Sequence, residues 1–200
     1  VVDVLRRRWL TMGEETQEFE REFSEALSVK HAIALGNATQ ALHLACLAAG
    51  IGTGDEVIVP SLTFVATSNA VLYCGAKVRF ADICGETDLC IDPQSVEEQV
   101  NDRTKAIIVM HYAGFPCKMN EILEIARKFN LFVIEDAAHA PGGRLEGLPL
   151  GTWGDMGCFS FFSNKNLITG EGGMLVTSQD ELAEKVRRLR SHGMTSLTWD

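Results

Sequence analysis

The sequence alternates short apolar runs with amphipathic helical segments over most of its length. Strands are expected at 32–35, 57–59, 77–80, 105–110, 131–134, 158–162 and 174–177. Helices are expected at 14–27, 36–49, 63–74, 120–129 and 180–191, and a further helix begins at Asp92-Pro93. Apolar strands separated by helices are typical of a parallel sheet covered on both faces. We therefore expect an α/β fold of three layers, with a mainly parallel sheet between helices.

The length and composition agree with one large domain. The chain has 200 residues, of which 46% are hydrophobic, which excludes a disordered chain and allows a sizeable core. We expect a single domain over residues 1–200, with a helical segment over residues 1–30. The chain opens without Met and stops in mid-pattern at Asp200, so we expect a fragment or a truncated reading frame.

The charge balance excludes several classes of partner. The formal net charge is −9, whereas a nucleic-acid-binding domain usually carries a basic face. The basic clusters 6–8 and 185–190 lie in helical patterns with acids nearby, which favours solvated helix faces. We expect no nucleic acid and no membrane among the partners.

The six cysteines indicate neither a metal site nor secretion. None forms C-x-x-C, and no pair of histidines has zinc-ligand spacing. The first ten residues lack a signal-peptide core, and the longest apolar run, 41–51, is too short to span a bilayer. We expect a cytoplasmic protein with reduced thiols and no metal.

Ligands of such folds bind outside the carboxyl ends of the strands, and a lysine follows the strand at 158–162. Lys165 is the only charged residue between Asp155 and Glu171. Apolar surroundings favour a neutral amine, which can attack a carbonyl group and form a Schiff base. The alternative is a surface lysine whose ammonium group reaches solvent.

A second candidate, Asp136, ends the apolar strand that begins at Leu131. Side chains alternate along a strand, so Glu135 and Asp136 are expected to point to opposite faces. A carboxylate at this place can hold a ring nitrogen protonated, as pyridoxal phosphate requires. The alternatives are an N-cap for a following helix and a metal site, for which no second group of ligands is present.

An anion site is expected where the strand at 32–35 passes into a helix. The segment Ala38-Thr39-Gln40 opens this helix, whose N–H groups and positive end favour a phosphate. The hydroxyl of Ser160 could bind the same phosphate. An ordinary N-cap by Asn37 or Thr39 is the alternative.

Other features are expected to have simpler roles. Phe64 follows the strand that ends at Pro60 and could stack on a flat cofactor ring, or lie in the core. The glycine-rich segment 50–54 precedes a strand, so it is a turn and not a dinucleotide loop. His43 and His111 are expected to be packed or hydrogen-bonded.

The order of these signals resembles the nucleotide-sugar aminotransferases, also called the DegT/StrS aminotransferases, among the fold-type I pyridoxal-phosphate enzymes. The resemblance runs from about Trp9 to Asp200. The stretches that carry it are 52–67, 133–140, 154–166 and 170–173. It implies the large domain of an aspartate-aminotransferase-like fold, and we expect the C-terminal small domain of the family to be missing from this chain.

The resemblance also implies roles for the site residues. Lys165 would form the Schiff base with the cofactor and move a proton, and Asp136 would pair with the pyridinium nitrogen. His139, where the family more often has Gln, would lie near the phenolic oxygen of the ring. The remaining contacts would be stacking by Phe64 and phosphate binding by Thr39, Gln40 and Ser160.

The activity implied by the family is transfer of an amino group from glutamate to a keto-sugar nucleotide, in polysaccharide or antibiotic sugar biosynthesis. Related dehydratases carry His in place of the lysine, so Lys165 favours amino transfer. A dehydratase or lyase and a non-catalytic fragment are the alternatives. The family's members form homodimers, which we expect for the full-length protein.

Overall fold

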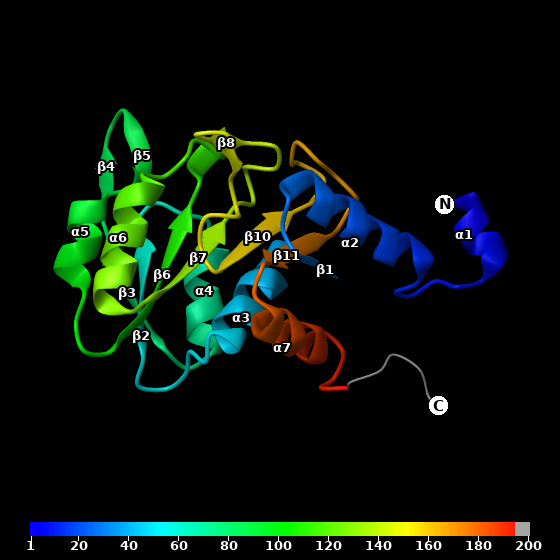
Figure 1. The fold of residues 1–200 in the computed structure, drawn as a ribbon, viewed down its shortest axis with the longest axis horizontal. Helices are drawn as coiled ribbons and strands as arrows, with labels where there is room; N and C mark the ends of the chain where they lie inside the picture. Colours follow the sequence, from blue (N-terminus) through cyan, green and yellow to red (C-terminus); the bar gives the residue numbers. More distant parts are fainter. Residues whose placement is uncertain (195–200) are drawn as a thin grey trace.

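A seven-stranded sheet forms the centre of the molecule in the computed structural model, which describes residues 1–194 (Figure 1). The strand order is β1-β11-β10-β7-β6-β2-β3. The strands are β1 (His31–Leu35), β2 (Glu56–Pro60), β3 (Lys77–Ala81), β6 (Thr104–Met110), β7 (Phe132–Asp136), β10 (Met156–Ser160) and β11 (Gly173–Thr177). The run from β10 to β3 is parallel, and β11 is antiparallel to both of its neighbours. The expected mainly parallel sheet is confirmed.

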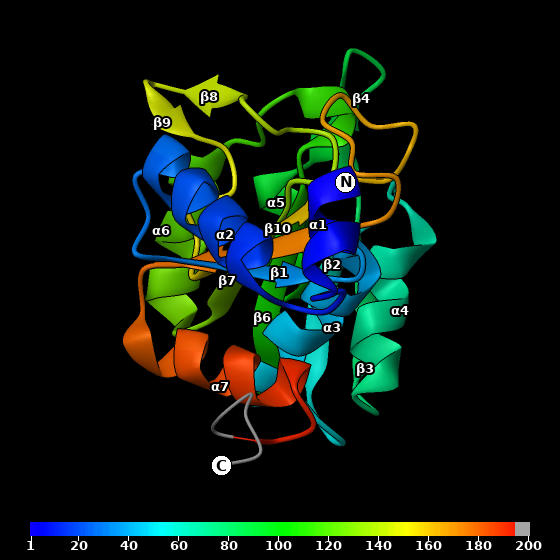
Figure 2. The same ribbon diagram turned by 90° about the vertical axis from the view of Figure 1, so that its right-hand side faces the viewer.

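Helices cover both faces of this sheet, as Figures 1 and 2 show. The helices are α1 (Val2–Arg7), α2 (Glu14–Leu27), α3 (Ala38–Ala48), α4 (Val65–Tyr73), α5 (Pro93–Gln99), α6 (Met119–Phe129) and α7 (Asp180–Arg190). Alternate residues of β6 divide between two cores. Ile108 packs with α3, α4 and α7, whereas Ile107 and Val109 pack with α5 and α6. A third core, around Phe159, joins α2 to the second face. These cores confirm the three layers.

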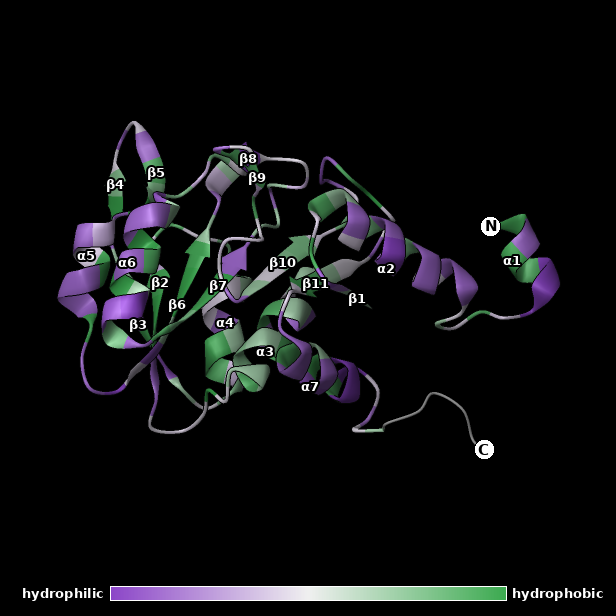
Figure 3. Cartoon of the chain, viewed as in Figure 1, coloured by the Kyte–Doolittle hydropathy of each residue, from purple (hydrophilic) through white to green (hydrophobic). Residues whose placement is uncertain are grey.

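Hydropathy follows the layers (Figure 3). The central strands and helices α3 and α4 are mostly hydrophobic, whereas α2 and α7 carry hydrophilic outer faces. Helix α1 has no buried residue and lies apart from the sheet in Figure 1. No helix in the described part of the chain is long and apolar enough to cross a membrane.

The expected helices are present, with small shifts at their ends. Helix α5 begins at Pro93 and is capped by Asp92, as expected. The helix expected at 63–74 begins at Val65, and the strand expected to reach residue 162 ends at Ser160. Two hairpins were not expected: β4 (Ile83–Gly85) with β5 (Asp88–Ile91), and β8 (Arg144–Leu145) with β9 (Leu148–Pro149). Their strands are too short to show a period.

The carboxyl ends of the parallel strands meet at one edge of the sheet. The first residue of β11, Gly173, pairs there with Ser160 on one side and with Leu35 on the other. A Cβ atom on Gly173 would lie 2.4 Å from the carbonyl carbon of Asn37. The glycine therefore lets β11 approach the N-terminus of α3.

Candidate active site

A cavity of about 510 Å³ lies at this carboxyl edge. Six of the seven predicted site residues line it: Thr39, Phe64, Asp136, His139, Ser160 and Lys165. The cavity is also lined by residues that the sequence did not indicate as site residues, among them Met110, Asn164 and Glu171. Segments that are far apart in the chain thus meet because their strands end side by side.

Asp136 is the buried acid of this cavity. It ends β7 and is 2% exposed. Its Oδ2 accepts a hydrogen bond of 2.7 Å from the hydroxyl of Thr67, and its Oδ1 accepts one of 3.2 Å from the N–H of Ala138. Burial raises the pKa of Asp136, and these two donors oppose that shift. The N-cap alternative is wrong, because the next helix within residues 1–194 begins at Asp180.

Thr67 is a polar residue of this site that the sequence did not reveal. It lies in α4, is fully buried, and also shares a hydrogen bond of 2.7 Å with the hydroxyl of Thr63. The only sequence feature that could have pointed to Thr67 is a hydroxyl side chain one turn after Phe64, on the helix that follows β2. Only the packing of α4 against the sheet brings it to Asp136.

Glu135 points to the opposite face from Asp136, as expected from strand alternation. Its carboxylate is fully buried and accepts hydrogen bonds of 2.7 Å from three backbone N–H groups, those of Gly151, Trp153 and Gly154. It also lies 2.8 Å from Nε2 of His111, which is buried and hydrogen-bonded as expected. No group of acids, histidines and cysteines able to hold a metal occurs among the residues described.

Lys165 lies in the connection between β10 and β11 and lines the cavity. Its side chain is half-buried, and its backbone N–H donates to the carbonyl of Phe162 at 2.9 Å. The expectation of enclosing apolar neighbours is corrected here. Phe162 and Ile168 are 42% and 56% exposed, because this connection runs over the surface instead of packing in the core.

The N-terminus of α3 combines a cap with the predicted anion site. The side chain of Asn37 accepts a hydrogen bond of 2.8 Å from the N–H of Gln40, so the N-cap alternative is present. The side chain of Gln40 turns back and accepts from the N–H of Gly36 at 2.9 Å. It is therefore occupied in the cap and is not among the residues that line the cavity, whereas Thr39 and Ser160 are.

Phe64 and His139 lie on the walls of the cavity. Phe64 precedes α4 and is 64% exposed, so the alternative that it is a core residue is wrong. The Nδ1 atom of His139 accepts a hydrogen bond of 3.2 Å from the N–H of Ala113. Burial, assisted by the charge of Lys165, lowers the pKa of His139.

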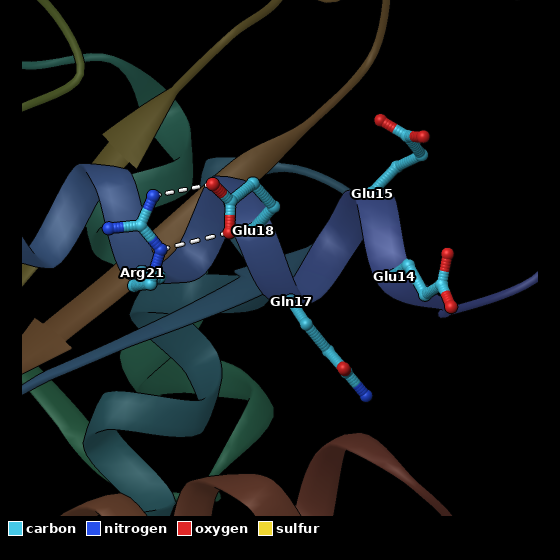
Figure 4. Close-up of a pocket in the computed structure, with 5 residues that line it drawn as sticks. All are labelled: Glu14, Glu15, Gln17, Glu18 and Arg21. Carbon is cyan, nitrogen blue, oxygen red and sulfur yellow. Dashed lines mark hydrogen bonds and ion pairs between the residues drawn. The ribbon is translucent and has the colours of Figure 1, made fainter.

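A second hollow, on the exposed side of α2, is lined by none of the predicted site residues (Figure 4). It is lined by Glu14, Glu15, Gln17, Glu18 and Arg21. The guanidinium of Arg21 pairs with Glu18, and these side chains are about half exposed. Exposed pairs of this kind contribute little to stability.

A mainly parallel sheet, with a lysine and a buried acid in one cavity at its carboxyl edge, defines an α/β enzyme domain. The model of the DegT/DnrJ/EryC1/StrS aminotransferase family matches residues 1–200. The chain belongs to this aminotransferase family, which confirms the resemblance found in the sequence.

Individual relatives agree with this assignment. GDP-perosamine synthase of Caulobacter vibrioides is 49% identical over 195 residues, which are 97% of this chain and 52% of the relative. The aminotransferase structure from Psychrobacter cryohalolentis has a TM-score of 0.93 and 40% identity, and the match covers 96% of this chain and 49% of that one. The structure of S. venezuelae DesV with a ketimine intermediate has a TM-score of 0.89 and 39% identity, covering 93% and 50%. The chain spans about half the length of the curated relatives it matches.

The cofactor of this family is pyridoxal 5′-phosphate. Such a group needs an acid for its ring nitrogen, an amine for its carbonyl carbon and an anion site for its phosphate. The cavity brings together Asp136, Lys165 and the first turn of α3, against which the backbone of Gly173 packs closely. The residues of the chain therefore fit the group.

Proposed function

We propose that this protein is a pyridoxal-phosphate-dependent aminotransferase that moves an amino group from glutamate to a keto-sugar nucleotide. One observation carries the proposal: Lys165 and the buried acid Asp136 line the same cavity at the carboxyl edge of the sheet. The relatives named as a GDP-perosamine synthase and a spore coat polysaccharide biosynthesis protein support a sugar substrate.

Each residue has a task that its surroundings support. When bound, the cofactor supplies an electron sink for the bonds that change at the amino carbon. Asp136, held by Thr67 and Ala138, would keep the proton on the ring nitrogen. The amine of Lys165 would hold the cofactor covalently and later move a proton between substrate and cofactor carbons.

Three further residues would position the cofactor. Phe64 offers an exposed ring for stacking at the wall of the cavity. Thr39 and Ser160 offer hydroxyl groups beside the positive end of α3, where a phosphate is favoured. Gln40 would contribute through its place in the cap of this helix, since its side chain accepts from Gly36.

A dehydratase or lyase that acts on a related sugar is the second candidate. The lysine at position 165 weighs against a dehydratase, because those relatives carry His there. A non-catalytic fragment is the third candidate, and the joint presence of Lys165 and Asp136 in one cavity weighs against it.

We also infer a homodimer in the cytoplasm. Helix α4, whose N-terminal end lies at the cavity, exposes large apolar side chains: Val65, Leu72 and Tyr73 are 58%, 55% and 58% exposed. A second copy of the protein would cover this face. The six cysteines are free thiols, which agrees with a reducing compartment. The length that the relatives have beyond this match would supply a small C-terminal domain.

Product analysis tests the reaction type. The protein, supplied with pyridoxal phosphate, glutamate and a panel of keto-sugar nucleotides, should form 2-oxoglutarate and an amino sugar in equal amounts. A deoxy-keto sugar without incorporated nitrogen would support the dehydratase. No reaction with any substrate by a protein that binds the cofactor would support a non-catalytic chain.

A further inference from the structure

We propose that the turn at Tyr112–Gly114 is a positioning device that fixes His139 in one tautomer, with its proton on Nε2. The nitrogen of His139 that is not held by this turn is then a hydrogen-bond donor. That it donates to the phenolic oxygen of the cofactor rests on the proposed function, whereas the tautomer itself does not.

The first observation is a strained residue beside the site. Ala113 has φ 53° and ψ 19°, the left-handed conformation that residues other than Gly rarely adopt. This conformation directs its N–H at Nδ1 of His139, 3.2 Å away. Strain in a backbone persists only where the surroundings impose it, and it gathers at functional sites.

The direction of this hydrogen bond determines the tautomer. A backbone N–H is always the donor, so Nδ1 of His139 must be the acceptor and carries no proton. A neutral imidazole then has its proton on Nε2. No protein group among residues 1–194 is hydrogen-bonded to Nε2, and the ring lines the cavity that holds Lys165 and Asp136.

The surroundings hold the turn from both ends. His111, just before it, is bound by the buried Glu135 at 2.8 Å and accepts from the N–H of Cys117 at 3.2 Å, so it brackets the turn. Gly114 has φ 86°, and a Cβ atom there would lie 3.1 Å from the carbonyl oxygen of His139. The buried Glu135–His111 pair, which has no role in the proposed reaction, would thus hold this turn in place.

The charges that face His139 favour its neutral form. Burial lowers the pKa of the ring, and the ammonium group of Lys165 lowers it further, while Asp136 acts in the opposite direction. The ring of Tyr112 packs edge-on, with the centroids 6.1 Å apart. A neutral ring has only one N–H, so its direction matters.

The need for such a device follows from the residue type. A Gln amide carries its donor and its acceptor on different atoms and needs no choice of tautomer. A neutral His presents either a donor or an acceptor on a given side. With His at position 139, a fixed tautomer secures a donor toward the cavity.

Nitrogen NMR on the cofactor-free protein labelled with 15N-histidine tests the proposal directly. The His139 signals are identified by their loss in His139→Gln. Above the ordinary histidine pKa of about 6.5, we expect a protonated Nε2 and a bare Nδ1. A proton mainly on Nδ1, or an even mixture, would overturn the proposal without touching the proposed function.

A pair of variants tests the turn itself. Ala113→Val should move the tautomer toward a mixture, because a β-branched residue resists the left-handed conformation, whereas Ala113→Gly should keep it. In the cofactor-loaded protein, Ala113→Val should shift the pH at which the cofactor absorbance changes, and this shift should vanish in the His139→Gln background. The same His139 tautomer in Ala113→Val and Ala113→Gly would contradict the proposed role of the turn. A pH shift that persists when His139→Gln is also present would contradict it too.

Discussion

At the scale of single residues, the site depends on a carboxylate that is almost wholly removed from water. Asp136 is 2% exposed and stays useful because a hydroxyl and a backbone N–H face its two oxygens. The N–H donor is that of Ala138, two residues further along the chain, and the hydroxyl donor is that of Thr67 in α4. Removing either donor leaves a buried oxygen without a partner, which is costlier than never burying it.

Thr67→Val should show this cost. The variant keeps the shape of the side chain and removes the hydroxyl, so the free energy of unfolding should fall by about 1–3 kcal/mol and cofactor affinity should also fall. Thr67→Ser, which keeps the hydroxyl, is the matched control. Urea unfolding of both variants gives the comparison, and equal stability of the two would show that the hydrogen bond contributes nothing.

Asp136→Asn should change how stability depends on pH. Burial raises the pKa of Asp136, so the folded chain binds this proton more tightly than the unfolded chain. The stability that this proton contributes is present below the unfolded pKa of about 3.9 and is lost as pH rises through the folded value. As the pH rises from acid to neutral, the free energy of unfolding of Asp136→Asn should therefore increase relative to that of the wild type. The variant should also bind the cofactor less tightly. A difference in unfolding free energy that stays constant over this range would contradict the prediction.

At the scale of elements, one close approach connects the sheet to the anion site. β11 runs against its neighbours and begins at Gly173, where the backbone touches the N-cap of α3. The sequence allowed the strands and helices to be predicted because their apolar period is strong. The two-residue strands at 144–145 and 148–149 are too short to show a period, so they could not be predicted. The connection around Lys165 is rich in apolar residues but runs over the surface, and only the packing of the folded chain determines that course.

Gly173→Ala should disturb this contact. Its Cβ atom would lie 2.4 Å from backbone that cannot easily move, so the free energy of unfolding should fall by about 1–3 kcal/mol, as in overpacked cores. Gly52→Ala is the control, because its Cβ atom would meet its nearest neighbour only at 4.0 Å. Denaturant titrations that find the two variants equally stable would refute the role given to Gly173.

At the scale of the whole molecule, the fold gathers residues from five strand ends into one cavity. The sequence indicated Lys165, Asp136, Thr39, Ser160, Phe64 and His139, because each lies at or shortly after the carboxyl end of a strand that the apolar pattern predicts. It could not indicate Thr67 or the turn at Ala113, since their contacts join segments 69 and 26 residues apart. Helix α4 also has an apolar face that no part of residues 1–194 covers.

Leu72→Glu should weaken the association of two copies if this face is the dimer contact. A charge in an apolar interface costs far more than one on a free surface, so the mass in sedimentation should fall to that of the monomer. Leu148, similarly exposed at 53% on the β8–β9 hairpin, supplies the control Leu148→Glu. Dimers that persist in the first variant would place the interface elsewhere.

The most direct measurement is borohydride reduction of the protein loaded with pyridoxal phosphate, followed by peptide mass spectrometry. We expect a yellow protein whose cofactor becomes fixed to one peptide, at Lys165, and an unlabelled Lys165→Ala variant that still folds. A protein that stays colourless with excess cofactor, or a label spread over other lysines and kept in Lys165→Ala, would contradict this expectation.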